Sequence, residues 1–154
     1  MITLDTREPK DLRSVLRLLA ESDGIQVDED VALPAGDFWL TWEDRLRIIE
    51  RKTVRDLSRC VRDGTLFGQL RRCKALGETI LLVEGTEWYP TGTRGVRGSY
   101  PEHVLHPNAI RGTLLSVQQN GILYVPTANK DDTIATVLWL HRNLKKSASD
   151  WSTK

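Results

Sequence analysis

The alternation of apolar and polar residues is most regular between positions 38 and 49, where it predicts a β-hairpin. Large apolar side chains occupy every second position of residues 38–42, and residues 46–49 are again mainly apolar. The polar pair Glu43-Asp44 separates the two runs. Two short runs of period two with a polar turn between them are typical of paired antiparallel strands.

This hairpin would bring two acids together at its open end. Asp37 precedes the first run and Glu50 follows the second, so we expect their side chains to lie side by side, with Lys52 on the same strand face as Glu50. Neighbouring carboxylates stay ionised together when a cation lies between them, and hard oxygen ligands suit Mg²⁺ or Mn²⁺. Such an ion lowers the pKa of a water and neutralises phosphate charge, and a nearby lysine can orient the water or stabilise the transition state. The pattern predicts metal-dependent phosphodiester hydrolysis, and its alternative is a surface hairpin with solvated charges.

The rest of the chain predicts alternating strands and helices. The strand at 79–84 is almost continuously apolar between two glycines, which is typical of a central strand buried on both faces. We expect residues 85–107 to form a long irregular loop, because glycine, proline, arginine and aromatic residues are frequent there. The other predicted strands are 1–5, 25–31 and 122–126, and the predicted helices are 10–22 (buried stripe Leu12, Val15, Leu16 and Leu19), 53–63 (N-cap Thr53), 66–76, 108–120 (N-cap Asn108) and 131–146.

Length and composition indicate one domain. The chain has 154 residues, 40% of them apolar, which suffices for a single core, and we expect a domain over 1–146 followed by a flexible tail at 147–154. It has no run of 18 apolar residues and no apolar signal core, so we expect a cytoplasmic protein if the source is microbial or viral, and a nuclear one if it is eukaryotic. Cys60 and Cys73 lack metal-binding spacing and are expected to be free thiols in a reducing compartment.

The charge is unevenly distributed. The formal net charge is only +1, yet ten Lys and Arg residues face three acids between Arg45 and Lys74. This basic segment contains the proposed metal site, which is typical of a protein that binds a polyanion such as nucleic acid. The alternative is a basic helix face that serves only solubility.

The acids, the lysine and their neighbours also form a recognisable string. Gly36, Asp37, Glu50, Arg51, Lys52 and Asp56 fill every fixed position of G-D-(x)n-E-R-K-x-x-x-D, with n equal to 12. The string resembles the signature of the XPF/Hef family of structure-specific DNA nucleases, within the PD-(D/E)xK group. Residues 4–8 resemble that family's VD-x-RE segment, with leucine for the usual valine, and residues 63–69 resemble its DGRLxxQ segment, with Thr65 in place of an arginine.

The resemblance implies a fold and a set of site residues. The fold is α/β of the restriction-endonuclease type, with three layers and a mixed central β-sheet flanked by α-helices. Asp5 could equally be a helix cap, Asp56 a helix-start acid and Gln69 an ordinary exposed glutamine. The implied catalytic set is Asp5, Asp37, Glu50, Arg51, Lys52 and Asp56, the metal set for Mg²⁺ (or Mn²⁺) is Asp37, Glu50 and Arg51, and the substrate-binding set is Arg7, Glu8, Gln69, Arg71 and Arg72.

The function expected from this resemblance is metal-dependent cleavage of branched DNA at flaps, forks or junctions. A Holliday-junction resolvase or general recombination nuclease on the same core is the first alternative. A non-catalytic DNA-binding partner subunit is the second, although such subunits typically lack the acids or the lysine. The family's C-terminal strand and helix commonly join two nuclease domains, so we expect a homodimer or a heterodimer through this region. The helicase and paired helix-hairpin-helix modules of the family are not found here, which suggests a stand-alone enzyme or an excised domain.

Overall fold

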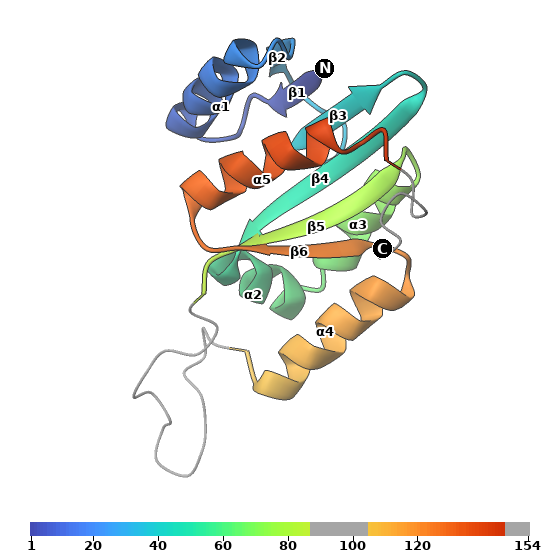
Figure 1. Ribbon diagram of the computed structural model, residues 1–154. Coiled ribbons are helices and arrows are strands. Elements are labelled where there is room, and N and C mark those ends of the chain that lie inside the picture. The colour runs from blue at the N-terminus through green and yellow to red at the C-terminus, as the bar shows by residue number, and fades with distance from the viewer. Residues whose placement is uncertain (87–104, 147–154) are drawn as a thin grey trace, which may run out of the picture.

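The fold of the described residues is a six-stranded mixed β-sheet with helices on both faces (Figure 1). It was obtained as a computed structural model that describes residues 1–86 and 105–146. The strands lie in the order β2-β1-β3-β4-β5-β6. The elements along the chain are β1 (Ile2–Asp5), α1 (Lys10–Ser22), β2 (Val27–Val31), β3 (Phe38–Trp42), β4 (Arg45–Thr53), α2 (Val54–Arg62), α3 (Leu66–Lys74), β5 (Glu78–Glu84), α4 (Pro107–Gln119), β6 (Leu123–Thr127) and α5 (Lys130–Arg142).

The predicted hairpin is confirmed and lies in the middle of the sheet. β3 and β4 pair antiparallel, with Phe38 opposite Ile49, and Glu43 takes a positive φ of 53° in the turn between them. β1 pairs antiparallel with β3, whereas the β1–β2, β4–β5 and β5–β6 pairs are parallel. The carboxyl ends of β1, β4 and β5 therefore lie at the same edge of the sheet as the start of β3, and their last residues come together there.

Two hydrophobic layers enclose the sheet and determine the direction of each side chain of β4. Ile49 packs in the layer beneath α1 and α5, whereas Ile48 packs against Cys73 of α3 on the opposite face. Because successive strand residues alternate between faces, Glu50 and Lys52 point to the α2–α3 face and Arg51 points to the α1–α5 face. The fold class predicted from the sequence, a three-layer α/β structure with a mixed sheet, is confirmed.

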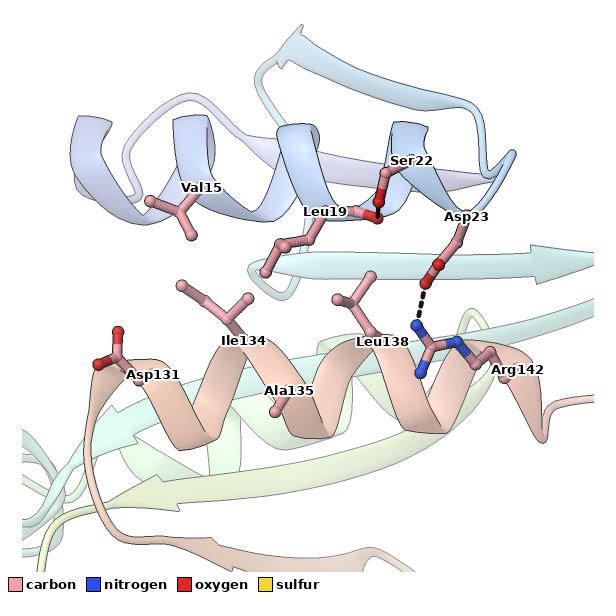
Figure 2. A pocket seen from close by; sticks show the side chains of 9 residues that line it. All are labelled: Val15, Leu19, Ser22, Asp23, Asp131, Ile134, Ala135, Leu138 and Arg142. Atoms are coloured by element: carbon pink, nitrogen blue, oxygen red, sulfur yellow. Dashed lines mark hydrogen bonds and ion pairs between the residues drawn. The ribbon is translucent and has the colours of Figure 1, made fainter.

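The inward stripe predicted for α1 is partly wrong. Leu12 and Leu16 are buried, but Val15 and Leu19 are 43% and 45% exposed. Both border a groove of about 420 Å³ between α1 and α5, where Leu19 points towards Ile134 and Leu138 (Figure 2). The other lining residues are Ser22, Asp23, Asp131, Ala135 and Arg142. An ion pair between Asp23 and Arg142 closes one end of this groove.

Two further differences concern helix ends. α4 begins at Pro107, and its cap is His106, whose Nδ1 accepts the Asn108 N–H, so the predicted cap at Asn108 is wrong by two residues. α5 ends at Arg142, four residues before the predicted end. No helix in the described parts of the chain is long and apolar enough to span a bilayer. Most of the predicted loop, residues 87–104, and the predicted tail, residues 147–154, lie outside the described residues.

Candidate active site

Asp37 and Glu50 are brought together by the register of the hairpin. Phe38 lies opposite Ile49, so Asp37, one residue before, lies opposite Glu50, one residue after. The Asp37 N–H donates to the Ile49 carbonyl at 2.8 Å, which continues the ladder to the site. Gly36, with φ of 76°, turns the chain into the strand in a conformation that favours glycine. The predicted pairing of the two carboxylates is thus a direct consequence of the hairpin.

Both carboxylates line one pocket of about 250 Å³ at the carboxyl edge of β4. The wall on the α3 side contributes Gln69 and Arg72, and Arg7 reaches the pocket from the loop after β1. Six predicted site residues, Lys52 among them, therefore line one cavity. They come from the loop after β1, from the β3–β4 hairpin and its approach, and from α3. The complete lining is Arg7, Pro34, Ala35, Gly36, Asp37, Glu50, Lys52, Gln69 and Arg72.

The Asp37 carboxyl is destabilised as an anion. Its burial, together with the charges of Glu50 and Glu8, raises its pKa to about 8. The Arg51 N–H donates to Asp37 Oδ2 at 2.7 Å and opposes this rise. A carboxyl with these neighbours releases its proton most readily when a cation compensates the charge.

Lys52 provides a fixed positive charge beside the acids. Its Nζ lies 2.9 Å from Glu50 Oε1, and its side chain is only 12% exposed. Burial would lower the pKa of Lys52, but Glu50 outweighs this effect and the pKa lies above its usual value. Lys52 is therefore an ammonium at neutral pH, suited to donate hydrogen bonds and to stabilise negative charge rather than to accept a proton. On the other side, the Cys73 thiol lies 3.9 Å from Glu50 Oε2.

Asp5 lies at the end of β1, fully buried, and holds the loop that carries Arg7. Its two oxygens accept from the Arg7 N–H at 2.8 Å, from Arg7 Nε at 2.7 Å and Nη2 at 2.8 Å, and from the Leu33 N–H at 2.7 Å. The Arg7 hydrogen bonds lower the pKa of Asp5 to about 2. Asp5 does not line the pocket, and it does not cap α1, because Pro9 occupies the position before the helix. It acts on the site by fixing Arg7.

The Arg51 side chain lies away from the pocket, although the resemblance implied a catalytic and metal-binding role for this residue. Its guanidinium binds Glu8 and Glu84 on the α1–α5 face and does not line the pocket. A guanidinium has no lone pair for a metal, so an oxygen ligand from Arg51 could only be its backbone carbonyl. Glu8 is occupied by the same ion pair and also lies outside the lining.

Two other predicted residues lie outside the pocket. Asp56 is in the first turn of α2, where its N–H bonds to Thr53 Oγ1 and its carboxylate pairs with exposed Arg59. This matches its alternative reading as a helix-start acid. Arg71 is exposed on α3 and absent from the lining, whereas the adjacent Arg72 belongs to it.

Gln69 carries a buried side-chain oxygen that is unpaired within the described parts of the chain. Its Oε1 has no hydrogen-bond partner among the described residues, although the side chain lines the pocket. A buried unpaired amide oxygen is costly, and such groups often bind a water or a ligand. Gln69 is thus an acceptor available to the pocket, which favours its site role over that of an ordinary exposed glutamine.

The donor set fits a hard divalent cation. Mg²⁺ binds through one or two protein carboxylates and completes its shell with waters and substrate oxygens, so Asp37 and Glu50 suffice. Within residues 1–86 and 105–146, no cluster of three or more His, Cys, Asp and Glu side chains suits a metal, so a closed structural site of the zinc type is not formed there. Burial and the charges of Glu50 and Glu8 raise the pKa of Asp37, so its ionised form needs more positive charge than Lys52 provides. A cation held by these two acids would supply it.

One contributor to the site region, Glu84, was absent from the predicted site residues. It ends β5 and binds the Arg51 guanidinium through both carboxylate oxygens. The available signal was an acid that ends an otherwise apolar strand, immediately before Gly85. Its partner Thr133 carries no comparable signal, because it is one of several threonines in the C-terminal third of the chain.

Comparison with known proteins agrees with this geometry. A family model described as the ERCC4 domain matches residues 4–138. A protein of Methanocaldococcus jannaschii named as an ATP-dependent RNA helicase, MJ1505, is 30% identical over 133 residues, which are 86% of this chain and 14% of that protein. The chain thus spans about one seventh of this relative.

Solved structures of an XPF protein also match this chain. XPF from Aeropyrum pernix superposes with a TM-score of 0.68 at 28% identity, over 97% of this chain and 67% of that one. The structure of the same protein in complex with DNA gives 0.67 at 28% identity, over 97% and 69%. The ERCC4 match covers most of the chain, and the fold is that of an XPF-type nuclease domain. The chain belongs to the ERCC4 domain family.

Proposed function

We propose that this chain is a divalent-cation-dependent endonuclease that hydrolyses phosphodiester bonds in branched DNA, at flaps, forks or junctions. The observation that carries the proposal is the placement of Asp37 opposite Glu50, beside the ammonium of Lys52, in a pocket that opens between Arg7 and Arg72. The match to an XPF protein that was solved in complex with DNA supports DNA as the substrate class.

The polar residues of the pocket would have separate roles in the reaction. Asp37 and Glu50 would hold Mg²⁺ or Mn²⁺, which when bound neutralises phosphate charge and lowers the pKa of a water. Lys52, a buried ammonium, would donate to the phosphate oxygen on which charge develops during the displacement. Gln69 Oε1 would accept a hydrogen bond from the attacking water and so help to orient it.

Arg7 and Arg72 would bind the phosphates that flank the scissile bond. The Arg7 side chain is 72% exposed, yet it is fixed at one end by Asp5, so little conformational entropy is lost when it binds an anion. Arg72 and Arg71 lie on the exposed side of α3, and Arg55 and Arg59 lie on exposed positions of α2. These arginines extend the positive charge from the pocket along two helices, as expected for a path of nucleic-acid backbone.

An oligomer through the C-terminal strand and helix is the second part of the proposal. β6 is an edge strand of the sheet, and exposed apolar side chains occur on it and on the two helices next to it. These are Leu123 on β6 at 48%, Leu115 on α4 at 57% and Trp139 on α5 at 49% exposure. Light scattering of the wild type and of Leu115→Glu and Leu123→Glu would test this, and we expect a dimer that both charges weaken.

The decisive experiment is a cleavage assay on end-labelled DNA. The substrates are a 3′ flap, a 5′ flap, a fork, a four-way junction and the matching linear duplex, each with Mg²⁺, Mn²⁺ or EDTA. We expect cleavage of one or more branched substrates, no cleavage in EDTA, and a loss of at least about 100-fold in Asp37→Asn. Glu78→Gln, a change far from the pocket on β5, is the matched control and should cleave normally.

Two results would overturn the proposal. Binding of branched DNA without cleavage in either cation would favour a non-catalytic partner subunit. Unchanged cleavage by Asp37→Asn would show that the nuclease activity does not depend on this carboxylate. Symmetric paired cuts restricted to the four-way junction would instead identify a resolvase on the same core.

A further inference from the structure

A buried network of charges lies on the face of β4 opposite the pocket, and the proposed chemistry does not use it. Arg51 Nε and Nη2 donate to the two oxygens of Glu84 at 3.1 and 2.8 Å, and Nη1 donates to Glu8 Oε2 at 3.0 Å. All three side chains are only 10–11% exposed. A guanidinium that is held by two carboxylates at this depth has almost no freedom to move.

The network continues into β6 and α5, which we call the β6–α5 unit. Thr133, in the first turn of α5, donates from Oγ1 to Glu84 Oε1 at 2.6 Å, and its own oxygen lies 2.7 Å from Thr127 Oγ1 at the end of β6. Thr133 is fully buried and Thr127 is 4% exposed. Burial would raise the pKa of Glu84, but the hydrogen bonds of Arg51 and Thr133 outweigh it, and the pKa lies below its usual value. Glu84 is therefore ionised, and it is bonded at the same time to Arg51 of β4 and to Thr133 of α5.

At its other end, the network reaches the carboxylate that would bind the cation. The backbone N–H of Arg51 donates to Asp37 Oδ2 at 2.7 Å. Arg51 also lies between Glu50 and Lys52 in the strand. A rotation of Arg51 would therefore turn the donor away from Asp37 and shift the residues on either side. Fixing the guanidinium on one face of β4 fixes the site on the other.

We propose that Glu84 and Thr133 are positioning residues of the active site. Through Arg51, they hold Asp37 in the orientation that binds the cation, and they connect the β6–α5 unit to cation affinity. The inference rests on the proposed function, because it assumes that Asp37 is a cation ligand. It adds a regulatory consequence: any partner that displaces the start of α5 would change the affinity of the site for its cation.

The conservative test is Thr133→Val, which removes one hydroxyl and no charge, accompanied by Glu84→Gln. Thr113→Val, a buried threonine of α4, is the control for the first, and Glu78→Gln is the control for the second. Glu78 pairs with Arg47 across the same two strands, β4 and β5, at their opposite end. Each pair thus compares the same substitution inside and outside the network.

Cation affinity is measured by thermal shift and by tryptophan fluorescence during titration with MgCl₂ and MnCl₂, and cleavage is then measured over the same concentrations. We expect the concentration for half-saturation to rise about tenfold in Thr133→Val and more in Glu84→Gln, as for other residues that support metal ligands. Cleavage at saturating cation should recover to within about threefold of the wild type in Thr133→Val, because no group that would contact substrate is altered. The controls should remain within twofold of the wild type.

A purely structural role gives a different pattern. In that case, Thr133→Val would lower the melting temperature without a change in the half-saturating cation concentration, and the inference would be wrong. An equal rise of the half-saturating cation concentration in Thr113→Val would overturn the inference as well, since the effect would then follow from the loss of any buried hydroxyl. If the wild type neither binds the cations nor cleaves, the proposed function fails and this inference fails with it. If the wild type does both and only the variants are unaffected, the inference alone fails.

Discussion

The Nζ of Lys52 lies 2.9 Å from Oε1 of Glu50, and both side chains are about nine-tenths buried. In the proposed function Glu50 would bind the cation, whereas Lys52 remains an ammonium because Glu50 raises its pKa against the effect of burial. We therefore expect Lys52→Met to lower single-turnover cleavage by about 100-fold or more while it retains the thermal shift caused by Mn²⁺. If Lys52→Met also lost the shift, the lysine would serve cation binding rather than the chemical step.

The stability of the protein should fall as the pH rises through the titration of Asp37. Its pKa is raised to about 8 in the folded state from an ordinary value of 3.8, so its contribution to stability is full below about pH 4 and is lost as the pH approaches 8. Asp37→Asn removes this penalty. In urea unfolding with EDTA, we expect the variant to exceed the wild type by on the order of 2–5 kcal/mol at pH 9, and by much less at pH 5. A constant difference across this range would contradict the assignment.

Binding of a divalent cation should offset the loss of folding stability that ionised Asp37 causes. In the wild type at pH 8, we expect saturating Mn²⁺ or Mg²⁺ to raise the free energy of unfolding, by about 2.7 kcal/mol at one hundred times the dissociation constant. Asp37→Asn should show little of this stabilisation, because one of the two carboxylates is gone. Differential scanning fluorimetry with EDTA back-titration measures both. The prediction fails if the variant is stabilised as much as the wild type.

The contribution of Asp5 to stability should have the opposite pH dependence from that of Asp37. The Arg7 hydrogen bonds lower its pKa to about 2, so its contribution to stability is present above about pH 4 and is lost as the pH falls through 2. Asp5→Asn should cost about 1–2 kcal/mol at pH 7, a figure reduced for the solvent exposure of Arg7. The difference between variant and wild type should close in acid. Chemical denaturation between pH 2 and 7 would show whether it does.

Gly36 should be intolerant of a side chain. A Cβ there would lie 2.4 Å from Ile48 Cγ2 and 3.2 Å from the Ile49 carbonyl oxygen, and φ is 76°. We expect Gly36→Ala to lower the free energy of unfolding by about 2–4 kcal/mol, from the positive φ and the overlap together. Gly24→Ala is the matched control, since its φ is 73° but nothing lies within 4 Å of the added Cβ, and it should cost about 1–2 kcal/mol. Equal losses in the two variants would show that the crowding at Gly36 is relieved at no cost.

The parts of the site that the residue pattern alone predicted are those that arise from local register, whereas Arg7, Gln69 and Arg72 were named only through the family resemblance. The spacing of Asp37, Glu50 and Lys52 within one hairpin determines their common face, because alternation along a strand has a period of two. The roles of Arg51 and Glu84 depend on how β4, β5 and α5 pack, which no local pattern specifies. The misassignment of Val15 and Leu19 has a similar origin: the stripe of α1 is wider than the surface that α5 and the sheet cover.

The burial of Asp37 has a consequence for descent within such a family. An acid of the proposed active site whose ionisation opposes folding is a residue that mutation can remove at a gain in stability, because it belongs to neither hydrophobic layer of the sheet. A duplicated gene relieved of selection for cleavage would lose this acid early and keep its shape. Inactive copies that keep the fold are therefore an outcome that the architecture itself favours.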